Sequence, residues 1–373
     1  MFAPLIEESQ SFLNLKKLVI DSGLCSLCGS CGLICEKIEY KDFPSLKEGT
    51  SCVINNGAKT CGTLGCCYDN CPMTSFFKKE YVLAIFGEEA SDPDLGVFKK
   101  IISARSTNNE ILSRAQNGGT ITSLLAYALS GNLTDPKYAG AIVTRKEEAW
   151  IPIPFFASKP EELLLSTGSI YSRLPLSQQI RSLLREKHNL IFVGTGCQTT
   201  GVRKYQYNFL NKVPPEVAHL FLIGVFCYEN FPYPQFKNAI QEKSKVSIDT
   251  ISKMDINKGK MILNIRDGTV LQIPIKEFNS LVPGACKFCT NFTAELADIS
   301  VGSVGAEENW NSLIIRSEEG LEVVERAEDD GIIETTTKVS IEPIRKIIAR
   351  KRLLSEKIVA KRREKDLYVP NFD

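Results

Sequence analysis

Apolar residues follow two different periods along the middle of the chain, and the two periods predict different elements. A helical spacing runs through residues 121–130 and 176–188. Short, nearly continuous apolar runs at 138–144 and 189–194 are typical of buried strands. Helices and strands therefore alternate along the chain, which indicates an α/β fold of the mixed α+β type.

The same patterns continue toward the C-terminus. Further strands are expected at 219–227, 260–267, 269–275 and 297–304, and a further helix at 320–331. No internal repeat or low-complexity linker interrupts this region. We therefore expect one large α/β domain.

Residues 344–366 have the pattern of an amphipathic helix. One helical face collects the apolar residues Ile344, Ile347, Ile348, Leu354 and Ile358. Basic residues crowd the rest of the surface, among them Arg350, Lys351, Arg352, Lys361, Arg362 and Arg363. Two interpretations stay open: a solvated helix on its own domain, or a docking arm for an acidic partner subunit.

Cysteines divide the chain into two parts. Nine of the 13 crowd into a short, turn-rich stretch near the N-terminus, and four are spread through the α/β part. The join at 88–96 is rich in Asp, Pro and Gly, which favour an exposed turn. We therefore expect a small domain at 1–90 and a large domain at 91–373.

Composition limits the classes of function. With 43% hydrophobic residues the chain can build a real core, and its net charge of +1 gives no general attraction to nucleic acid or anionic membranes. We see no apolar stretch that could cross a bilayer and no secretory signal, so a cytoplasmic location is the default expectation. Reducing compartments keep thiols free, and an odd number of cysteines cannot pair completely. The cysteines are therefore interpreted as metal ligands.

The run CSLCGSCGLIC has the spacing that binds a [4Fe-4S] cluster. It contains Cys25, Cys28, Cys31 and Cys35. In two-cluster ferredoxins the fourth cysteine of such a run ligates the other cluster. Cys71, which precedes Pro72, is therefore expected to complete the site of the first three.

A second ferredoxin-type cluster would use Cys35 together with Cys61 and Cys67. The usual run would also need a cysteine at position 64, which is Leu64 here; Cys66 and Cys52 are possible substitutes. A zinc ribbon is the alternative for this region, although zinc sites generally pair two C-x2-C hairpins across a longer gap.

The loop AQNGGTITS, before the helix at 121–130, is a candidate phosphate-binding site. Its candidate ligand-binding residues are Asn117, Gly118, Gly119, Thr120 and Thr122. The glycines allow close backbone approach, and the N–H groups at a helix start can hold an anionic phosphate. The alternative is a capped helix after a tight turn.

The four remaining cysteines are Cys197, Cys227, Cys286 and Cys289. The last two form one C-x2-C pair, and with the two single cysteines they are enough for a third cubane cluster. Buried free thiols are the alternative for Cys197 and Cys227.

From residue 101 onward the sequence resembles the β subunit of coenzyme F420-reducing hydrogenase and its relatives. The resemblance rests on ISARST, AQNGGTITSLLAYAL, CQTTGVRK, GVFCYENFPY, KMDINKGK, ACKFC and AELADISVGSVG. It implies a fold that binds FAD, with coenzyme F420 as the substrate over the flavin ring and a nearby cluster held by the four later cysteines. It also makes Arg105, Lys258 and Lys260 candidates for the anionic parts of these molecules; surface solvation is their alternative.

The N-terminal part resembles the ferredoxin extension of family members that serve larger redox complexes. The resemblance implies an electron-transfer subunit in which hydride passes between F420 and FAD, and single electrons pass through about three clusters. Hydrogenase, formate dehydrogenase, heterodisulfide reductase or a membrane dehydrogenase complex could be the partner. No catalytic acid or base is expected, and neither His188 nor His219 is assigned a role.

Two other functions stay open at the level of the sequence. Related chains reduce chlorophyll intermediates with electrons from ferredoxin. The segments CYENFPY and MDINKGK favour the F420 branch of the family instead. A noncatalytic iron–sulfur adaptor is the second alternative, but its task needs far less than a large α/β domain.

Overall fold

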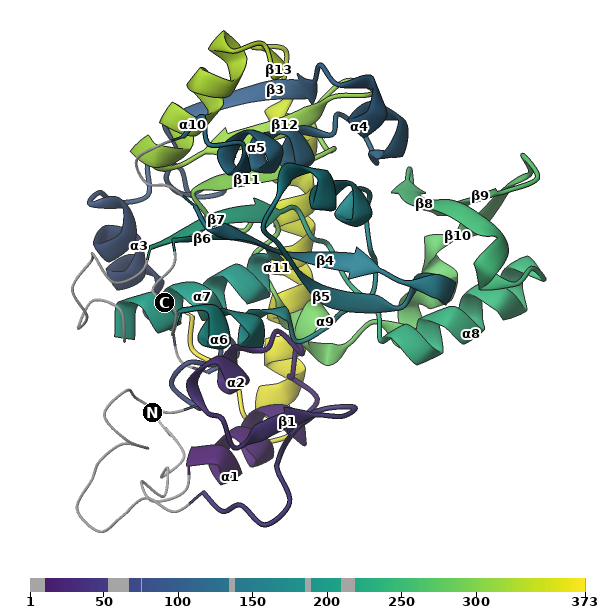
Figure 1. Cartoon of the computed structure of the whole chain (residues 1–373). Helices are drawn as coiled ribbons and strands as arrows, with labels where there is room; N and C mark the ends of the chain where they lie inside the picture. The colour runs from purple at the N-terminus through teal and green to yellow at the C-terminus, as the bar shows by residue number, and fades with distance from the viewer. Residues whose placement is uncertain are drawn as a thin grey trace.

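A mixed eight-stranded sheet forms the centre of the computed structural model, which describes residues 11–52, 67–74, 76–133, 138–184, 189–208 and 219–372 (Figure 1). The strand order is β13-β3-β12-β11-β7-β6-β4-β5. The strands are β3 (Lys100–Ser106), β4 (Gly140–Lys146), β5 (Pro152–Ala157), β6 (Leu190–Thr195), β7 (Leu220–Val225), β11 (Ile299–Gly302), β12 (Asn311–Ile315) and β13 (Ile333–Thr336). The neighbours β4, β6, β7 and β11 run parallel, so their carboxyl ends meet at one edge.

Helices cover both faces of this sheet. One face packs on α5 (Thr120–Leu129) and α10 (Glu318–Asp329); the other packs on α6 (Ile180–Leu184) and α7 (Gly196–Asn208). Successive strand residues point to opposite faces, and Ile191 and Phe192 accordingly belong to different apolar cores. The predicted mixed α/β class is confirmed.

Most predicted elements are present with shifted ends. The helix expected at 176–188 begins as a 3₁₀ turn, η4 (Leu176–Gln179), before α6; its last four residues, His188 among them, lie outside the described part. Shorter helical segments are α4 (Asn109–Arg114), η2 (Glu148–Trp150), η3 (Pro160–Ser166), η6 (Ile248–Thr250), η7 (Ile275–Leu281) and α9 (Gly284–Phe288).

A separate lobe stands beside the main sheet (Figure 1). It consists of an antiparallel sheet of β8 (Ile251–Asn257), β9 (Lys260–Ile265) and β10 (Val270–Pro274), covered by α8 (Tyr233–Ser244). Phe231, Phe236 and Phe278 form an aromatic core inside the lobe. The strands β9 and β10 were predicted, whereas β8 was not.

The N-terminal cysteine-rich part packs directly against the large domain. Its elements are α1 (Ser11–Leu15), which continues into a π-helical turn η1 (Lys16–Ile20), then α2 (Ser30–Ile34), β1 (Ile38–Tyr40), β2 (Pro44–Leu46) and α3 (Lys78–Phe86). Its core includes Ala285 and Phe288 of α9. The packing is tight: a Cβ atom on Gly201 of α7 would lie 1.7 Å from Ser30 Oγ.

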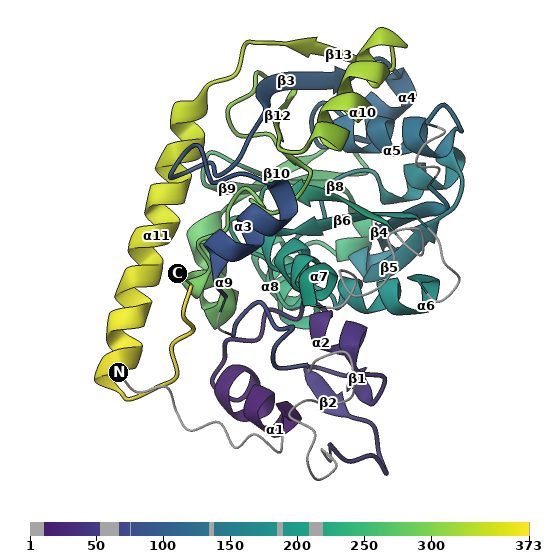
Figure 2. The ribbon, with the colours of Figure 1, turned by 90° about the vertical axis from the view of Figure 1, so that its left-hand side faces the viewer.

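The C-terminal helix α11 (Ile341–Glu364) runs along the molecule from the main sheet to the cysteine-rich part (Figure 2). Arg345 and Arg352 bind the carboxylates of Asp92 and Asp94 at the join between the two parts. The helix therefore lies on its own chain. One detail of its predicted pattern is wrong: Lys351 is not on the solvated face but is 3% exposed. None of the helices in the described ranges has the length and apolar character needed to span a bilayer.

Candidate functional site

The four later cysteines, which we call the late cysteines, line one cavity of about 30 Å³. Cys197 begins the helix after β6, and Cys227 follows the end of β7. Because these strands are parallel neighbours, the two cysteines lie at the same edge of the sheet. Cys286 lies in the short helix α9 and Cys289 directly follows it, and both line the same cavity.

The thiols of the late cysteines make few polar contacts with the described residues, of which the shortest joins Cys197 Sγ to Thr195 Oγ1 at 3.4 Å. Cys227 Sγ is 3.7 Å from the carbonyl oxygen of Glu229, and Cys286 Sγ is 3.9 Å from that of Asn230. Burial raises the pKa of Cys227 to about 12, and it also raises the pKa of Cys197. Thiolates therefore form here only beside a compensating cation, which is the condition of metal ligation.

The arrangement of these side chains is not that of a site for one metal ion. Within the described residues, no three His, Cys, Asp or Glu side chains converge closely enough to hold a single metal ion. Four soft donors around an open cavity match a polynuclear iron–sulfur group better than a tetrahedral zinc site. Arg173 also lines this cavity, and its Nε is buried without a hydrogen-bond acceptor among the described residues.

The cysteines of the N-terminal part gather in a second group, which we call the early cysteines: Cys25, Cys28, Cys31, Cys67 and Cys71. Cys31 lies within electrostatic reach of Cys25, Cys28 and Cys67. Cys71 lies within reach of Cys28 and Cys31, and its Sγ accepts a 3.4 Å hydrogen bond from the N–H of Met73. Cys35 and Cys52 border the same core, while Cys61 and Cys66 lie outside the described residues.

The two groups adjoin each other. Cys28 raises the pKa of both Cys71 and Cys197, although burial is the larger cause for each. Ser26, in the loop between Cys25 and Cys28, lines the cavity of the late cysteines. A charge carrier in one group would therefore lie next to the other.

A large cleft of about 1840 Å³ opens beside the late cysteines. It runs between the carboxyl edge of the main sheet, the lobe and α11. Cleft and cavity share six lining residues: Leu174, Thr195, Gln198, Cys227, Tyr228 and Asn230. A molecule in the cleft can therefore approach the cysteine cavity directly.

The predicted glycine loop forms one wall of this cleft, through Asn117, Gly119, Thr120 and Thr122. Gly119 has φ +67°, where a side chain would be strained. Gly118 is not part of the lining. A Cβ atom there would lie 2.8 Å from Ala104 O and from Asn311 Oδ1, so its role is close packing. The buried Thr120 hydroxyl donates to Ala104 O at 2.9 Å.

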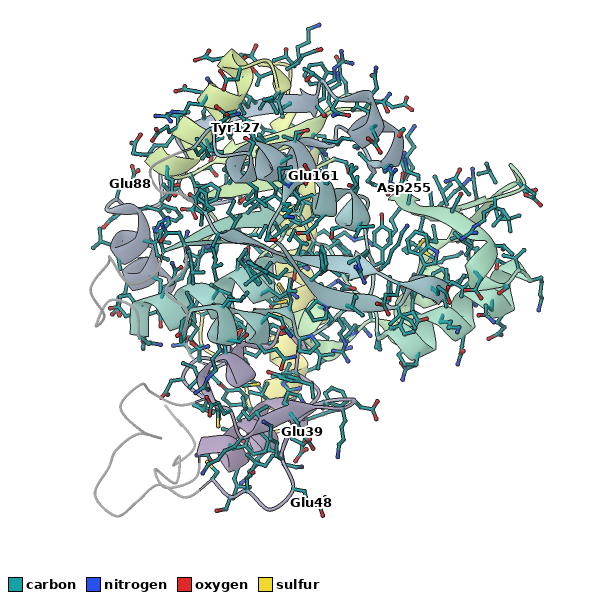
Figure 3. The ribbon with its side chains drawn as sticks, in the orientation of Figure 1. Glu39, Glu48, Glu88, Tyr127, Glu161 and Asp255 are labelled. Carbon is teal, nitrogen blue, oxygen red and sulfur yellow. The ribbon has the colours of Figure 1, made fainter. Side chains whose placement is uncertain are left out.

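The lobe forms the facing wall through Lys253, Asp255 and Lys258, and Figure 3 labels Asp255 at the side of the lobe toward the sheet. Lys253 spans the cleft and donates from Nζ to Ala115 O at 2.8 Å. The other two predicted cations are not among the lining residues. Arg105 pairs with Glu334 and stacks on Trp310, and Lys260 donates to Gln272.

Several cations that line the site were not predicted as site residues, among them Arg173, Lys253 and Lys351. Lys253 is the first residue of the segment KMDINKGK, from which only Lys258 and Lys260 were predicted as ligand-binding residues. The signal for Lys351 was its place on the apolar stripe of α11, between the buried Ile348 and Ser355. Arg173 lies in an aperiodic segment that gave no signal. His219 hydrogen-bonds Glu319, away from the cleft lining.

Two family profiles match the chain, and both describe the "Coenzyme F420 hydrogenase/dehydrogenase, beta subunit". The profile of its N-terminal part matches residues 101–181, and the profile of its C-terminal part matches residues 187–340. Together they cover the glycine loop, the late cysteines and the lobe.

Individual relatives extend this similarity. The beta subunit of coenzyme F420 hydrogenase from Methanothermobacter thermautotrophicus is 37% identical and covers 74% of this chain and 99% of that protein. The F subunit of F(420)H(2) dehydrogenase from Methanosarcina mazei is 26% identical and covers 90% of this chain and 91% of that protein. A chain of the F420-reducing [NiFe] hydrogenase complex from Methanosarcina barkeri has a TM-score of 0.67 at 32% identity, covering 73% of this chain and 94% of that one.

Proposed function

Because the chain belongs to the family of coenzyme F420 hydrogenase/dehydrogenase β subunits, we propose that it transfers reducing equivalents between F420 and a partner redox enzyme. The observation that carries this proposal is the shared wall of the cleft and the cysteine cavity. A substrate that exchanges a hydride and a group that carries single electrons can lie side by side there.

The cleft is proposed to hold FAD and F420. FAD, when bound, supplies the exchange of a hydride with F420 and of single electrons with iron–sulfur clusters. Its phosphates suit the start of α5, where Gly119 at φ +67° provides no capping side chain and the loop lines the cleft. Lys258, which lines the cleft, is proposed to hold an anionic part of FAD or F420. Arg105 and Lys260 are not among the lining residues, so they could contact either molecule only from outside the cleft wall.

The late cysteines are proposed to ligate a [4Fe-4S] cluster next to the flavin. Four soft donors around one cavity, and the desolvation that raises the pKa of Cys197 and Cys227, support this assignment. Cys25, Cys28, Cys31 and Cys71 are proposed to ligate a second cluster in a ferredoxin-like domain at 1–90, ahead of the FAD- and F420-binding domain at 91–373. A third cluster would use Cys35 and cysteines of the stretch 52–67. The adjoining position of Cys28 and Cys197 supports a continuous path between the two domains.

The test is anaerobic purification followed by addition of reduced F420. In the purified protein we expect FAD and at least eight iron atoms per chain, roughly the content of two cubane clusters. When reduced F420 is mixed with this protein, we expect the absorbance of the oxidised flavin to bleach. Clusters without extractable FAD would favour the adaptor function. Bound FAD that does not bleach would favour a ferredoxin-dependent reductase of another substrate. Zinc in place of iron would overturn the proposal.

A further inference from the structure

Lys351 is a buried cation at a position where the pattern of its helix calls for an apolar residue. The buried residues of α11 are Ile344, Ile348, Lys351 and Ser355, which follow the i, i+4, i+7, i+11 spacing of a core stripe. Lys351 is 3% exposed. Burying an ammonium is costly unless an anion or several acceptors compensate it.

The compensation available from the described residues is incomplete. Lys351 Nζ donates a 2.6 Å hydrogen bond to the carbonyl oxygen of Tyr228, and the Tyr228 ring centroid is 5.1 Å away. The ion pairs of the described residues do not include Lys351. An ammonium has three donors, so the visible acceptor leaves most of its charge unsatisfied.

Lys351 also faces the cavity of the late cysteines. Lys351 lines that cavity, and its acceptor Tyr228 directly follows Cys227. Burial alone would lower the pKa of Lys351, but Cys289, Cys227 and Cys286 outweigh it and raise that pKa. The ammonium therefore lies within electrostatic reach of three of the four late cysteines.

We propose that Lys351 is the fixed counter-charge of the iron–sulfur cluster held by the late cysteines and raises the reduction potential of that cluster. The inference rests on the proposed function, since it needs a cluster at this site. Reduction adds one electron to an anionic cluster, and a buried cation stabilises the more negative state more than the oxidised one. Such a shift would favour electron transfer from the flavin to this cluster.

The experiment uses the full chain, purified anaerobically, with the midpoint potential read by EPR-monitored redox titration. The signal of the late cluster is the one lost in Cys286→Ala. Lys351→Gln keeps a hydrogen-bond donor but removes the charge, and we expect about a tenfold shift toward the oxidised form, which is 59 mV for a one-electron couple. Lys351→Arg keeps the charge and is expected to leave the potential nearly unchanged.

Two control variants separate this effect from a general change of charge. Lys346 is a lysine of the same helix outside its buried stripe, so Lys346→Gln should leave the late cluster unaffected. Lys204 is 1% exposed and donates to Cys71 O at 2.7 Å, so Lys204→Gln should shift the signal of the early cysteines instead.

Each outcome has one meaning. A late cluster whose potential is the same in Lys351→Gln and in the wild type overturns the inference and leaves the proposed function intact. A potential that falls equally in Lys351→Gln and Lys351→Arg also overturns it, because the geometry and not the charge would then matter. No signal lost in Cys286→Ala would instead overturn the cluster assignment. The potential is read from molecules that retain the cluster, so partial cluster loss does not obscure it.

Discussion

Arg173 Nη1 donates a 2.9 Å hydrogen bond to the carbonyl oxygen of Cys25. The same guanidinium lines the cavity of the late cysteines. One side chain of the large domain thus holds the loop of the early cysteines against the site of the late ones. This hydrogen bond is a specific link between the two groups of cysteines.

Arg173→Gln should therefore slow electron transfer between the two cysteine groups. Loss of the bond to Cys25 lets the loop move away, and we expect about a tenfold lower rate, since misplacement by about an ångström is costly. The measurement is stopped-flow absorbance of the proposed clusters after mixing with reduced F420.

Arg181→Gln is the matched control for that variant. Arg181 also binds the N-terminal part, donating to Ile34 O at 2.7 Å, but it does not line the cysteine cavity. It should loosen the docking of the two parts without changing the rate of transfer. Equal slowing in both variants would mean that Arg173 acts only by fastening the domains.

The ends of the parallel strands were the part of the site that the sequence predicted best. The apolar runs before Cys197 and Cys227 indicated two buried strands, and the glycine pair before α5 indicated a loop. These are local signals, and the structure has both strands and the loop at one edge of the sheet. The neighbouring positions of β6 and β7 could not be predicted, because strand order depends on packing between distant segments.

The charged residues of the site were predicted less well. The sequence alone does not distinguish a buried lysine from a solvated one. Lys351 was therefore assigned to the solvated face of its helix, although it is buried. Arg173 contacts Cys25 across a separation of 148 residues, which no local pattern encodes. Arg105 lies in a sequence segment that resembles the family, yet it forms an ion pair with Glu334 of the neighbouring strand β13.

Gly118→Ala should impair the cleft without unfolding the chain. The added Cβ would lie 2.8 Å from Ala104 O, so the loop must shift away from β3. We expect a loss of about 1–3 kcal/mol of stability and a clear fall in the FAD content of the purified protein. Gly131→Asn, at the other end of α5 with open space beside it, should retain FAD. Full FAD content in Gly118→Ala would remove the glycine loop from the proposed flavin site.

Gly201→Ala should separate the cysteine-rich part from α7. A methyl group at this position would lie 1.7 Å from Ser30 Oγ and 2.7 Å from Ser30 Cβ. Both atoms belong to Ser30, so the second change Ser30→Gly should restore much of the stability lost. Thermal unfolding of the single and double variants measures this coupling. Simple addition of the two effects would mean that the strain is relieved elsewhere.

The contact between Arg345 and Asp92 should make stability depend on pH in the acid range. Hydrogen bonds from Arg345 are the largest cause that lowers the pKa of Asp92 from 3.8 to about 2. The folded state thus binds this proton less readily than the unfolded state. The stabilisation is complete above about pH 4 and is lost as the pH falls from 3.8 toward 2.

Arg345→Met removes this contact while leaving the length of the side chain similar. We expect a loss of stability at pH 7, kept modest because the pair is exposed to solvent, and a smaller difference from the wild type at about pH 3. Urea unfolding at a series of pH values measures both. The control is Arg326→Met, whose partner Glu322 lies one turn away on an exposed face of α10 and whose loss should cost less than about 0.5 kcal/mol. If the difference between Arg345→Met and the wild type did not shrink below about pH 4, Asp92 would not be the group through which the join is fastened to α11.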